Sequence, residues 1–216
     1  MNDREKQILK ILRRNPLIQQ NEIADILQIS RSRVAAHIMD LMRKGMIKGK
    51  GYILTEQDYC VVVGAINMDI RGVADIHYPQ AASNPGSIHC SAGGVGRNIA
   101  HNMRLLGVPT YLLTAVGGDS RASQVEESCK ELGIDLSHAL RVPDGRTSTY
   151  VFVGDSDGDM AVAVADMEIC EKLTPDYFAS QKELLDGAAA VVVDANLPRE
   201  SIAYLVEHCA APLFVD

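Results

Sequence analysis

The stretch Ser91-Ala92-Gly93-Gly94-Val95-Gly96-Arg97-Asn98 runs directly into a helical pattern over residues 99–106, and the rest of the chain is interpreted around it. Three glycines in four positions remove side chains where something must approach the backbone closely. The first N–H groups of the following helix gather partial positive charge at the same place. Asn98, in the first turn, adds amide donors and an acceptor. The pattern favours a polyhydroxylated ligand or an anion, and a tight loop before a core helix is the alternative.

Two better-known glycine loops are excluded. A dinucleotide fingerprint requires G-x-G-x-x-G, but the third glycine position after Gly94 and Gly96 is Ile99. A P-loop requires Gly-Lys followed by Ser or Thr, and this tripeptide does not occur in the sequence.

Composition limits the classes of protein that remain. With 216 residues, 47% apolar and 23% charged, the chain has the composition of a globular protein of one or two domains. No apolar run reaches the roughly 18–20 residues that a membrane span needs, so no membrane partner is expected. The five cysteines are scattered and form no C-x-x-C pair. They predict reduced thiols in a cytoplasmic protein and no metal site.

Charge is unevenly distributed along the chain. Residues 1–58 carry a net charge of +4, whereas residues 59–216 carry −11. The two parts are therefore expected to face different partners.

The basic N-terminal part has the pattern of three helices followed by a hairpin. Asn15-Pro16 ends the first helix. Gln28-Ile29-Ser30 forms the turn before a third helix at about 31–44, with Ser30 as its cap. Residues 46–54 are expected to form a two-stranded hairpin with a basic tip. The expected inward positions are Ile8, Leu9, Ile11 and Leu12, then Ile23, Ala24, Ile26 and Leu27, then Val34, Ile38, Leu41 and Met42.

This order of elements resembles a winged helix-turn-helix over residues 3–55, which predicts a DNA-binding domain at residues 1–56. Six basic residues against one acid between Arg31 and Lys50 agree with a surface that binds phosphates. The resemblance implies that the third helix enters the major groove and that the wing touches the backbone. The implied contacts are Arg31, Ser32, Arg33 and His37 on the helix, and Lys48 and Lys50 on the wing. A protein-docking or dimerisation module is the alternative.

The second part begins with a continuous apolar run at residues 59–64, typical of a buried parallel strand. Asn67 and Asp69 follow just beyond the carboxyl end of this strand, where ligands collect in open α/β sheets. An Asp at this place can accept hydrogen bonds from two sugar hydroxyls, although capping a turn is the commoner use of such a residue. Residues 70–90 are rich in turn signals and predict turns and short strands.

Strands and helices then alternate, which predicts an α/β domain with a mainly parallel sheet. A strand, two glycines and an acid recur at residues 111–119, before a helix at about 121–132. Residues 147–166 predict a β-hairpin whose long turn contains Asp155, Asp157 and Asp159. The turn lacks the downstream Glu of a calcium loop, so turn chemistry is the better explanation. A buried strand at 188–194, a helix at about 199–209 and a strand from Pro212 complete the pattern.

Three motifs in order carry a resemblance to a known family: Asn67-Met68-Asp69, Gly93-Gly94-Val95-Gly96-Arg97-Asn98 and Ala115-Val116-Gly117-Gly118-Asp119. With them, residues 59–216 resemble the ribokinase-like (PfkB) carbohydrate kinases. Ser83-Asn84-Pro85-Gly86 favours the pseudouridine kinase branch.

The resemblance implies transfer of the γ-phosphoryl group of ATP, with Mg²⁺, to a hydroxyl of a nucleoside or sugar. Asp69, with Asn67 beside it, would hold ribose hydroxyls, and Gly93, Gly94 and Asn98 would bind the sugar. Asn196 lies where many members place another sugar contact. Residues 70–90 and 147–166 resemble the lid of the family, which covers the sugar and often forms a homodimer interface.

The sequence departs from the family in one respect. The signature Asp-Thr-x-Gly-Ala-Gly-Asp, which supplies the catalytic base and the anion hole, is absent. Residues 59–216 are therefore expected to be the N-terminal, sugar-binding part of an incomplete ribokinase-like domain, with the base and most of the ATP site beyond Asp216. This chain alone is expected to be inactive. The alternative function is a transcriptional regulator that uses a kinase-derived domain as a nucleoside or sugar sensor.

Overall fold

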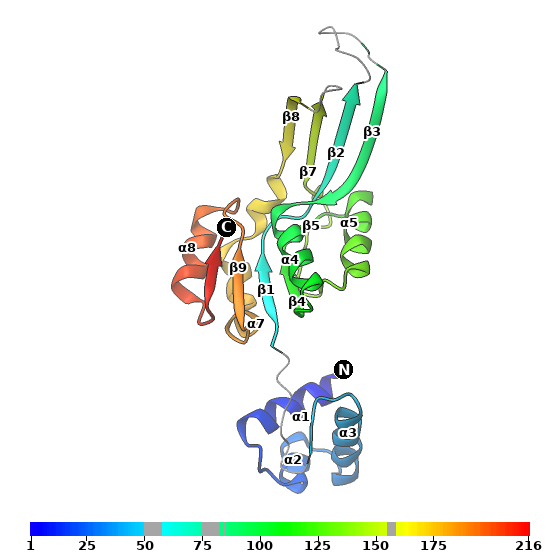
Figure 1. The fold of residues 1–216 in the computed structure, drawn as a ribbon. Helices are drawn as coiled ribbons and strands as arrows, with labels where there is room; N and C mark the ends of the chain where they lie inside the picture. Colours follow the sequence, from blue (N-terminus) through cyan, green and yellow to red (C-terminus); the bar gives the residue numbers. More distant parts are fainter. Residues whose placement is uncertain (50–57, 75–82, 84, 155–158) are drawn as a thin grey trace. The chain divides into compact units, whose positions relative to one another are not determined.

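The computed structural model describes residues 1–49, 58–74, 83, 85–154 and 159–216. The chain divides into two compact units, Met1–Gln57 and Asp58–Asp216, and each is described by itself (Figure 1).

The first unit contains the three expected helices, α1 (Asp3–Arg14), α2 (Gln20–Leu27) and α3 (Arg31–Arg43). Their apolar faces share one core, which includes Ile8, Leu12 and Ile23. Two residues expected to face inward do not: Ile26 is 59% exposed and Met42 is 37% exposed. Both lie at the border of the apolar stripe, where helical periodicity alone does not decide burial. Of the expected hairpin, residues 50–54 lie outside the described residues.

Local chemistry sets the ends of these helices. The Ser30 hydroxyl accepts a hydrogen bond of 3.3 Å from the backbone N–H of Arg33, as expected for the cap of α3. Gln28 ends α2 with a left-handed φ of 53°, which makes the sharp turn between α2 and α3. Glu5, which is 2% exposed, accepts 2.8 Å bonds from the Lys44 ammonium through both carboxylate oxygens. This ion pair, whose carboxylate is buried and whose ammonium is half-exposed, ties the start of α1 to the end of α3.

The second unit is an α/β domain. Its strands are β1 (Cys60–Val63), β2 (Asn67–Ala74), β3 (Gly86–Gly93), β4 (Thr110–Leu113), β5 (Ala115–Val116), β6 (Leu140–Arg141), β7 (Thr149–Gly154), β8 (Met160–Asp166), β9 (Ala190–Val193) and β10 (Leu213–Val215). Its helices are α4 (Val95–Leu105), α5 (Ser120–Glu131), a 3₁₀ helix η1 (Glu168–Lys172), α6 (Pro175–Ser180), α7 (Lys182–Asp186) and α8 (Arg199–His208).

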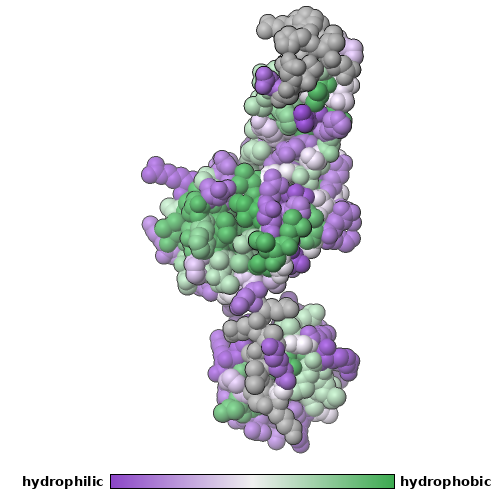
Figure 2. All heavy atoms as spheres, in the orientation of Figure 1, coloured by the Kyte–Doolittle hydropathy of each residue, from purple (hydrophilic) through white to green (hydrophobic). Residues whose placement is uncertain are grey.

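The body sheet has the order β10-β9-β1-β4 and all its pairs are parallel, as expected (Figure 1). Side chains of β1 alternate between two cores. Val61 and Val63 pack with Phe178 of α6, whereas Val62 packs with Ala100 of α4. Helices thus cover both faces, which is why β1 is apolar throughout. On the visible face of the second unit, hydrophobic residues gather over α8 and the edge strand β10 (Figure 2).

The lid sheet has the order β3-β2-β7-β8, and its four strands lie side by side and extend beyond the body sheet (Figure 1). Strands β2 and β3 are antiparallel, as are β7 and β8, while β2 and β7 are parallel. The expected hairpin at 147–166 is present as β7 and β8. Residues 70–90 contribute to strands as expected, but β2 and β3 have eight residues each and are longer than the short strands expected, and residues 75–82 and 84 lie outside the described residues. In the described residues no helix is long and apolar enough to cross a membrane.

Candidate functional site

The predicted site is built on the first residues of β2, which is separated from the end of β1 by three residues. Asn67 is 2% exposed, and its side-chain amide donates a hydrogen bond to Oδ1 of Asp69. Asp69 itself is half-buried. The structure therefore brings the predicted pair together, with the buried amide orienting the more accessible carboxylate.

The glycines are required because this pair lies against them. A Cβ atom on Gly93 would lie 2.6 Å from Cγ of Asp69. A Cβ atom on Gly94 would lie 2.8 Å from Oδ1 of Asn67, and its φ of +101° also favours glycine. The sequence indicated that something approaches the backbone here. In the structure, the Asn67 and Asp69 side chains make that approach.

The start of α4 differs from the expectation of free N–H groups. The backbone N–H of Arg97 donates to the carbonyl of Ala65 over 3.2 Å, so this donor is used within the protein. Asn98 is exposed in the first turn of α4, and its Oδ1 accepts a 3.1 Å bond from Nη1 of Arg97. The amide predicted to contact a ligand is thus accessible and held by a neighbouring guanidinium.

Burial is the main influence on the pKa of Asp69. Desolvation raises the pKa of Asp69 above its ordinary value, and the Asn67 hydrogen bond and the positive charge of Arg97 oppose this shift. A half-buried carboxylate with a raised pKa gains from hydroxyl donors that replace the water it has lost.

Asp194, which the sequence analysis did not single out, organises the second predicted contact. It is 1% exposed and follows directly after β9. Its Oδ1 accepts 2.9 Å and 2.8 Å bonds from the backbone and side-chain nitrogens of Asn196, and its Oδ2 accepts a 3.3 Å bond from the backbone of Ala65. Asn196 is exposed. The only signal in the sequence was an acid that ends an apolar run.

Asp119 joins the lid sheet to the body. Its carboxylate caps α5 at Ala122 N (3.0 Å) and accepts from the hydroxyl (2.7 Å) and backbone N–H (3.1 Å) of Thr147, just before β7. Desolvation raises the pKa of Asp119, but these hydrogen bonds outweigh it, so its pKa lies below the ordinary value. The predicted Gly-Gly-Asp motif therefore serves as an anchor for the lid sheet.

The Asp69 face of the lid sheet also carries aromatic and cationic side chains that the sequence analysis missed. Tyr150 lies opposite Asp69, and Phe152 lies opposite Arg71, in the pairing of β2 with β7. The two rings are 5.8 Å apart, and the Arg71 guanidinium lies 5.9 Å from the Phe152 ring. Alternation along a strand places such residues on one face, which could be recognised only once the register was known.

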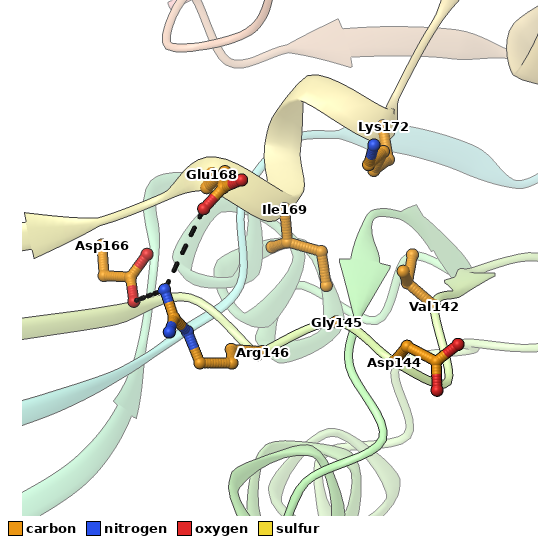
Figure 3. Close-up of a pocket in the computed structure, with 8 residues that line it drawn as sticks. All are labelled: Val142, Asp144, Gly145, Arg146, Asp166, Glu168, Ile169 and Lys172. Atoms are coloured by element: carbon orange, nitrogen blue, oxygen red, sulfur yellow. Dashed lines mark ion pairs between the residues drawn. The ribbon is translucent and has the colours of Figure 1, made fainter.

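A cavity of about 470 Å³ lies beside the base of the lid sheet. Its lining residues are Val142, Asp144, Gly145, Arg146, Asp166, Glu168, Ile169 and Lys172 (Figure 3). Arg146 points at the acids of β8 and η1, with Nη2 at 3.4 Å from Asp166 and 3.9 Å from Glu168. None of the predicted site residues lines this cavity, so it is distinct from the arrangement around Asp69.

Comparison with known proteins identifies the family. The family model described as "pfkB family carbohydrate kinase" matches residues 57–211. The chain belongs to the pfkB family. A second model, "Winged helix-turn-helix DNA-binding", matches residues 1–48. Both expected family resemblances are therefore confirmed.

Two curated relatives come from Escherichia coli K12. The chain is similar to the "Uncharacterized sugar kinase YeiI", with 57% identity over 100% of the chain and 60% of that protein. It is similar to a pseudouridine kinase, with 38% identity over 76% of the chain and 52% of that protein. The second match agrees with the expected branch. The chain thus spans between half and two thirds of the length of these relatives.

Solved structures confirm the expected ribokinase-like α/β fold. A carbohydrate kinase from Agrobacterium tumefaciens matches with a TM-score of 0.68 and 29% identity, covering 73% of this chain and 53% of that one. A ribokinase from Arabidopsis thaliana, complexed with ribose and ATP, matches with a TM-score of 0.65 and 23% identity, covering 74% and 53%. At 23% identity, the likeness to the Arabidopsis ribokinase shows a shared fold and nothing more.

The described part of this pfkB chain does not assemble a cluster of metal ligands. It contains no group of three or more His, Cys, Asp or Glu residues placed to hold a metal ion. Asp69, the ionisable member of the predicted site, accepts a hydrogen bond from Asn67 through Oδ1.

In the winged helix-turn-helix unit, the predicted DNA contacts differ in exposure. Arg31, Ser32 and Arg33 are exposed in the first turn of α3, and Lys48 is also exposed. His37 is half-buried, and the hydroxyl of Ser32 lies 3.0 Å from that of Ser30. Lys50 lies outside the described residues.

Proposed function

We propose that the full-length protein is an ATP-dependent kinase, with Mg²⁺, that phosphorylates a hydroxyl of a nucleoside or sugar in the manner of a pseudouridine kinase. The observation that carries the proposal is the Asp69 carboxylate, oriented by buried Asn67 and packed against Gly93 and Gly94 beside the start of α4. A half-buried, partly desolvated carboxylate suits a pair of vicinal hydroxyls. ATP enters this proposal as the phosphoryl donor because the chain belongs to the pfkB family.

The roles within this site follow from the groups available. Asp69 accepts hydrogen bonds from ribose hydroxyls, Asn98 and the backbone around Gly93 and Gly94 provide further contacts, and Asn196 contributes from the end of β9. Asp194 holds the Asn196 side chain in place. The catalytic base remains a prediction for the region beyond Asp216.

A nucleoside is favoured over a plain sugar by the aromatic and cationic residues beyond Asp69 on the same face of the lid sheet. Arg71 is two residues from Asp69 along β2, about 7 Å at 3.4 Å per residue. A base attached to a ribose held at Asp69 would thus meet the Arg71–Phe152 pair, which offers donors and a ring face.

The test is a phosphorylation assay of the full-length protein with ATP, Mg²⁺ and a panel of pseudouridine, uridine, inosine and ribose. Phosphorylation of at least one nucleoside, lost in Asp69→Ala, is the expected result. If all four compounds remain unphosphorylated by the wild type, the substrate proposal is wrong.

The second candidate function is a transcriptional regulator that senses a nucleoside or sugar. Exposed Arg31 and Arg33 at the start of α3, with no acid in its first turn, support DNA binding by the N-terminal unit. A gel shift that changes when a nucleoside is added would support the sensor. A shift insensitive to every compound of the panel would contradict it.

The lid sheet is also proposed to form a homodimer. Its face opposite Asp69 exposes aliphatic side chains, with Ile88 75%, Val162 56% and Val164 63% exposed. Such a contiguous apolar face is typical of an interface. Sedimentation should give a dimer for the wild type and a monomer for Val162→Asp/Val164→Asp, and a monomeric wild type would contradict the proposal. A cytoplasmic location remains a prediction.

A further inference from the structure

Arg97 lies inside the glycine stretch, but none of the roles proposed above uses its side chain. Its guanidinium bridges two helices, with Nη1 at 3.1 Å from Oδ1 of Asn98 and Nη2 at 3.0 Å from Oγ of Ser128 on α5. Its Nε is buried and has no hydrogen-bond partner among the described residues. The two terminal nitrogens therefore fix the position of the guanidinium, at the expense of an unsatisfied Nε.

This contact decides which way the Asn98 amide faces. Arginine carries five N–H donors and no acceptor, so the Asn98 atom that lies against Nη1 must be the oxygen. The NH₂ group of Asn98 is then turned away from Arg97. Asn98 is exposed, and no other side-chain contact with the described residues favours this orientation over the flipped one.

We propose that Arg97 is a positioning residue that presents the NH₂ group of Asn98, rather than its oxygen, to the ligand. The amide then recognises an acceptor, such as a ribose hydroxyl oxygen, while Asp69 accepts from hydroxyl hydrogens. The site thus offers one fixed donor and one fixed acceptor to a polyhydroxylated ring. This inference rests on the proposed binding of a ribosyl ligand at Asp69.

A purely structural role is the competing explanation, since the bond to Ser128 braces α4 against α5. The chain offers a matched control for that role. Arg104, also on α4, is partly buried, donates from Nη1 to the Val108 carbonyl over 3.0 Å and likewise has a buried Nε without a partner. It does not contact Asn98, so its loss should affect stability without affecting the ligand.

The test is a double-mutant cycle on the full-length protein, with pseudouridine as the probe and the dissociation constant measured by calorimetry. Arg97→Ala and Asn98→Ala should each weaken binding by about tenfold, as expected for one hydrogen bond to the ligand. If Arg97 acts through Asn98, the double variant should bind no more weakly than Asn98→Ala. Arg104→Ala should bind as the wild type does. Effects of Arg97→Ala and Asn98→Ala that multiply in the double variant would overturn the proposal.

Two further readouts separate positioning from folding. Arg97→Lys keeps the charge but has a single nitrogen, so it should fold and still lose most of the affinity lost in Arg97→Ala. Arg97→Ala should also raise the pH at which affinity falls on acidification. The reason is that the guanidinium favours the ionised form of Asp69, whose other polar contact is Asn67. The proposal would be contradicted if Arg97→Lys bound with wild-type affinity and the affinity of Arg97→Ala fell at the same pH as that of the wild type. If the wild type binds ribose but not pseudouridine, ribose becomes the probe, and if it binds neither, the proposed function itself fails.

Discussion

The body sheet and the lid sheet belong to one unit of the chain but are stabilised differently. All four residues of β1 in the body are buried, whereas six of the eight residues of β3 in the lid sheet are exposed. The body is held by apolar packing on both faces. The lid sheet is held by its strand ladders and by its anchor at the body. The predicted site lies where the two meet, so a rigid wall and an accessible surface both contribute to it.

The largest effect is expected from a matched pair of glycines. A Cβ on Gly96 in the body would lie 2.7 Å from the Cα of Gly64, whereas the nearest atom to a Cβ on Gly72 in the lid sheet is 3.7 Å away. Gly96→Ala should therefore destabilise the protein by about 3 kcal/mol or more. Gly72→Ala should change stability by no more than about 1 kcal/mol. Differential scanning calorimetry checks both, and equal losses would contradict the comparison.

A smaller effect is expected from a matched pair of valines. Val63 in β1 is fully buried, whereas Val164 in β8 is 63% exposed. Val63→Ala should cost about 2–3 kcal/mol from lost burial and the cavity that remains. Val164→Ala should stay within about 0.5 kcal/mol in the monomer. Urea unfolding of the monomer, at a protein concentration below dimerisation and followed by circular dichroism, measures both, and a loss above about 1 kcal/mol for Val164→Ala there would contradict the comparison.

The anchor between the two sheets should give an intermediate effect. Thr147 is fully buried and its hydroxyl joins Asp119 to the N–H of Gly117, so Thr147→Val should cost about 1–2 kcal/mol. The folded-state pKa of Asp119 is lowered, so its contribution is complete above the unfolded pKa and is lost as the pH falls through the folded pKa.

Stability measured from pH 7 to pH 2 checks this assignment. The wild type should lose part of its stability below about pH 4, near the ordinary pKa of Asp. Thr147→Val should lose less over the same interval, because its Asp119 pKa is closer to the ordinary value. Parallel curves for the two proteins would contradict the anchor.

The smallest effect concerns ligand binding at acid pH. Burial raises the pKa of Asp69, so its carboxylate becomes protonated in the folded protein at a pH above the ordinary value of 3.8. Affinity for pseudouridine should therefore fall as the pH decreases through that raised pKa, while Asp119 is still ionised. Calorimetric titrations from pH 7 down to the ordinary Asp pKa of 3.8 measure it, and constant affinity over that whole range would contradict the role of Asp69.

The sequence predicted the body better than the lid sheet, for a physical reason. Strand β1 is a continuous apolar run because both its faces are buried, and the glycines at 93, 94 and 96 mark close approach whatever the partner. β2 and β3 contain Gly72, Gly86 and Gly93, and glycine is depleted from strands, which weakens the signal for long strands. The helices α6 and α7 have six and five residues, too few to show a helical period.

The candidate site shows the same difference. Asn67 and Asp69 follow a strong strand signal, so their place could be predicted. Asp194 and the Arg97–Asn98 contact could not, because each depends on which side chains the fold brings together. The prediction of free N–H groups at the start of α4 is wrong for Arg97, whose N–H donates to the carbonyl of Ala65.

The most direct test of the account is a calorimetric titration of the wild type and Asp69→Ala with pseudouridine at pH 7, with Asp176→Ala, a substitution in α6, as a control. The account predicts saturable binding to the wild type and to the control, weakened by about tenfold or more in Asp69→Ala through loss of charge-assisted hydrogen bonds. Equal affinity of the wild type and Asp69→Ala would show that the carboxylate oriented by Asn67 is not the ligand site.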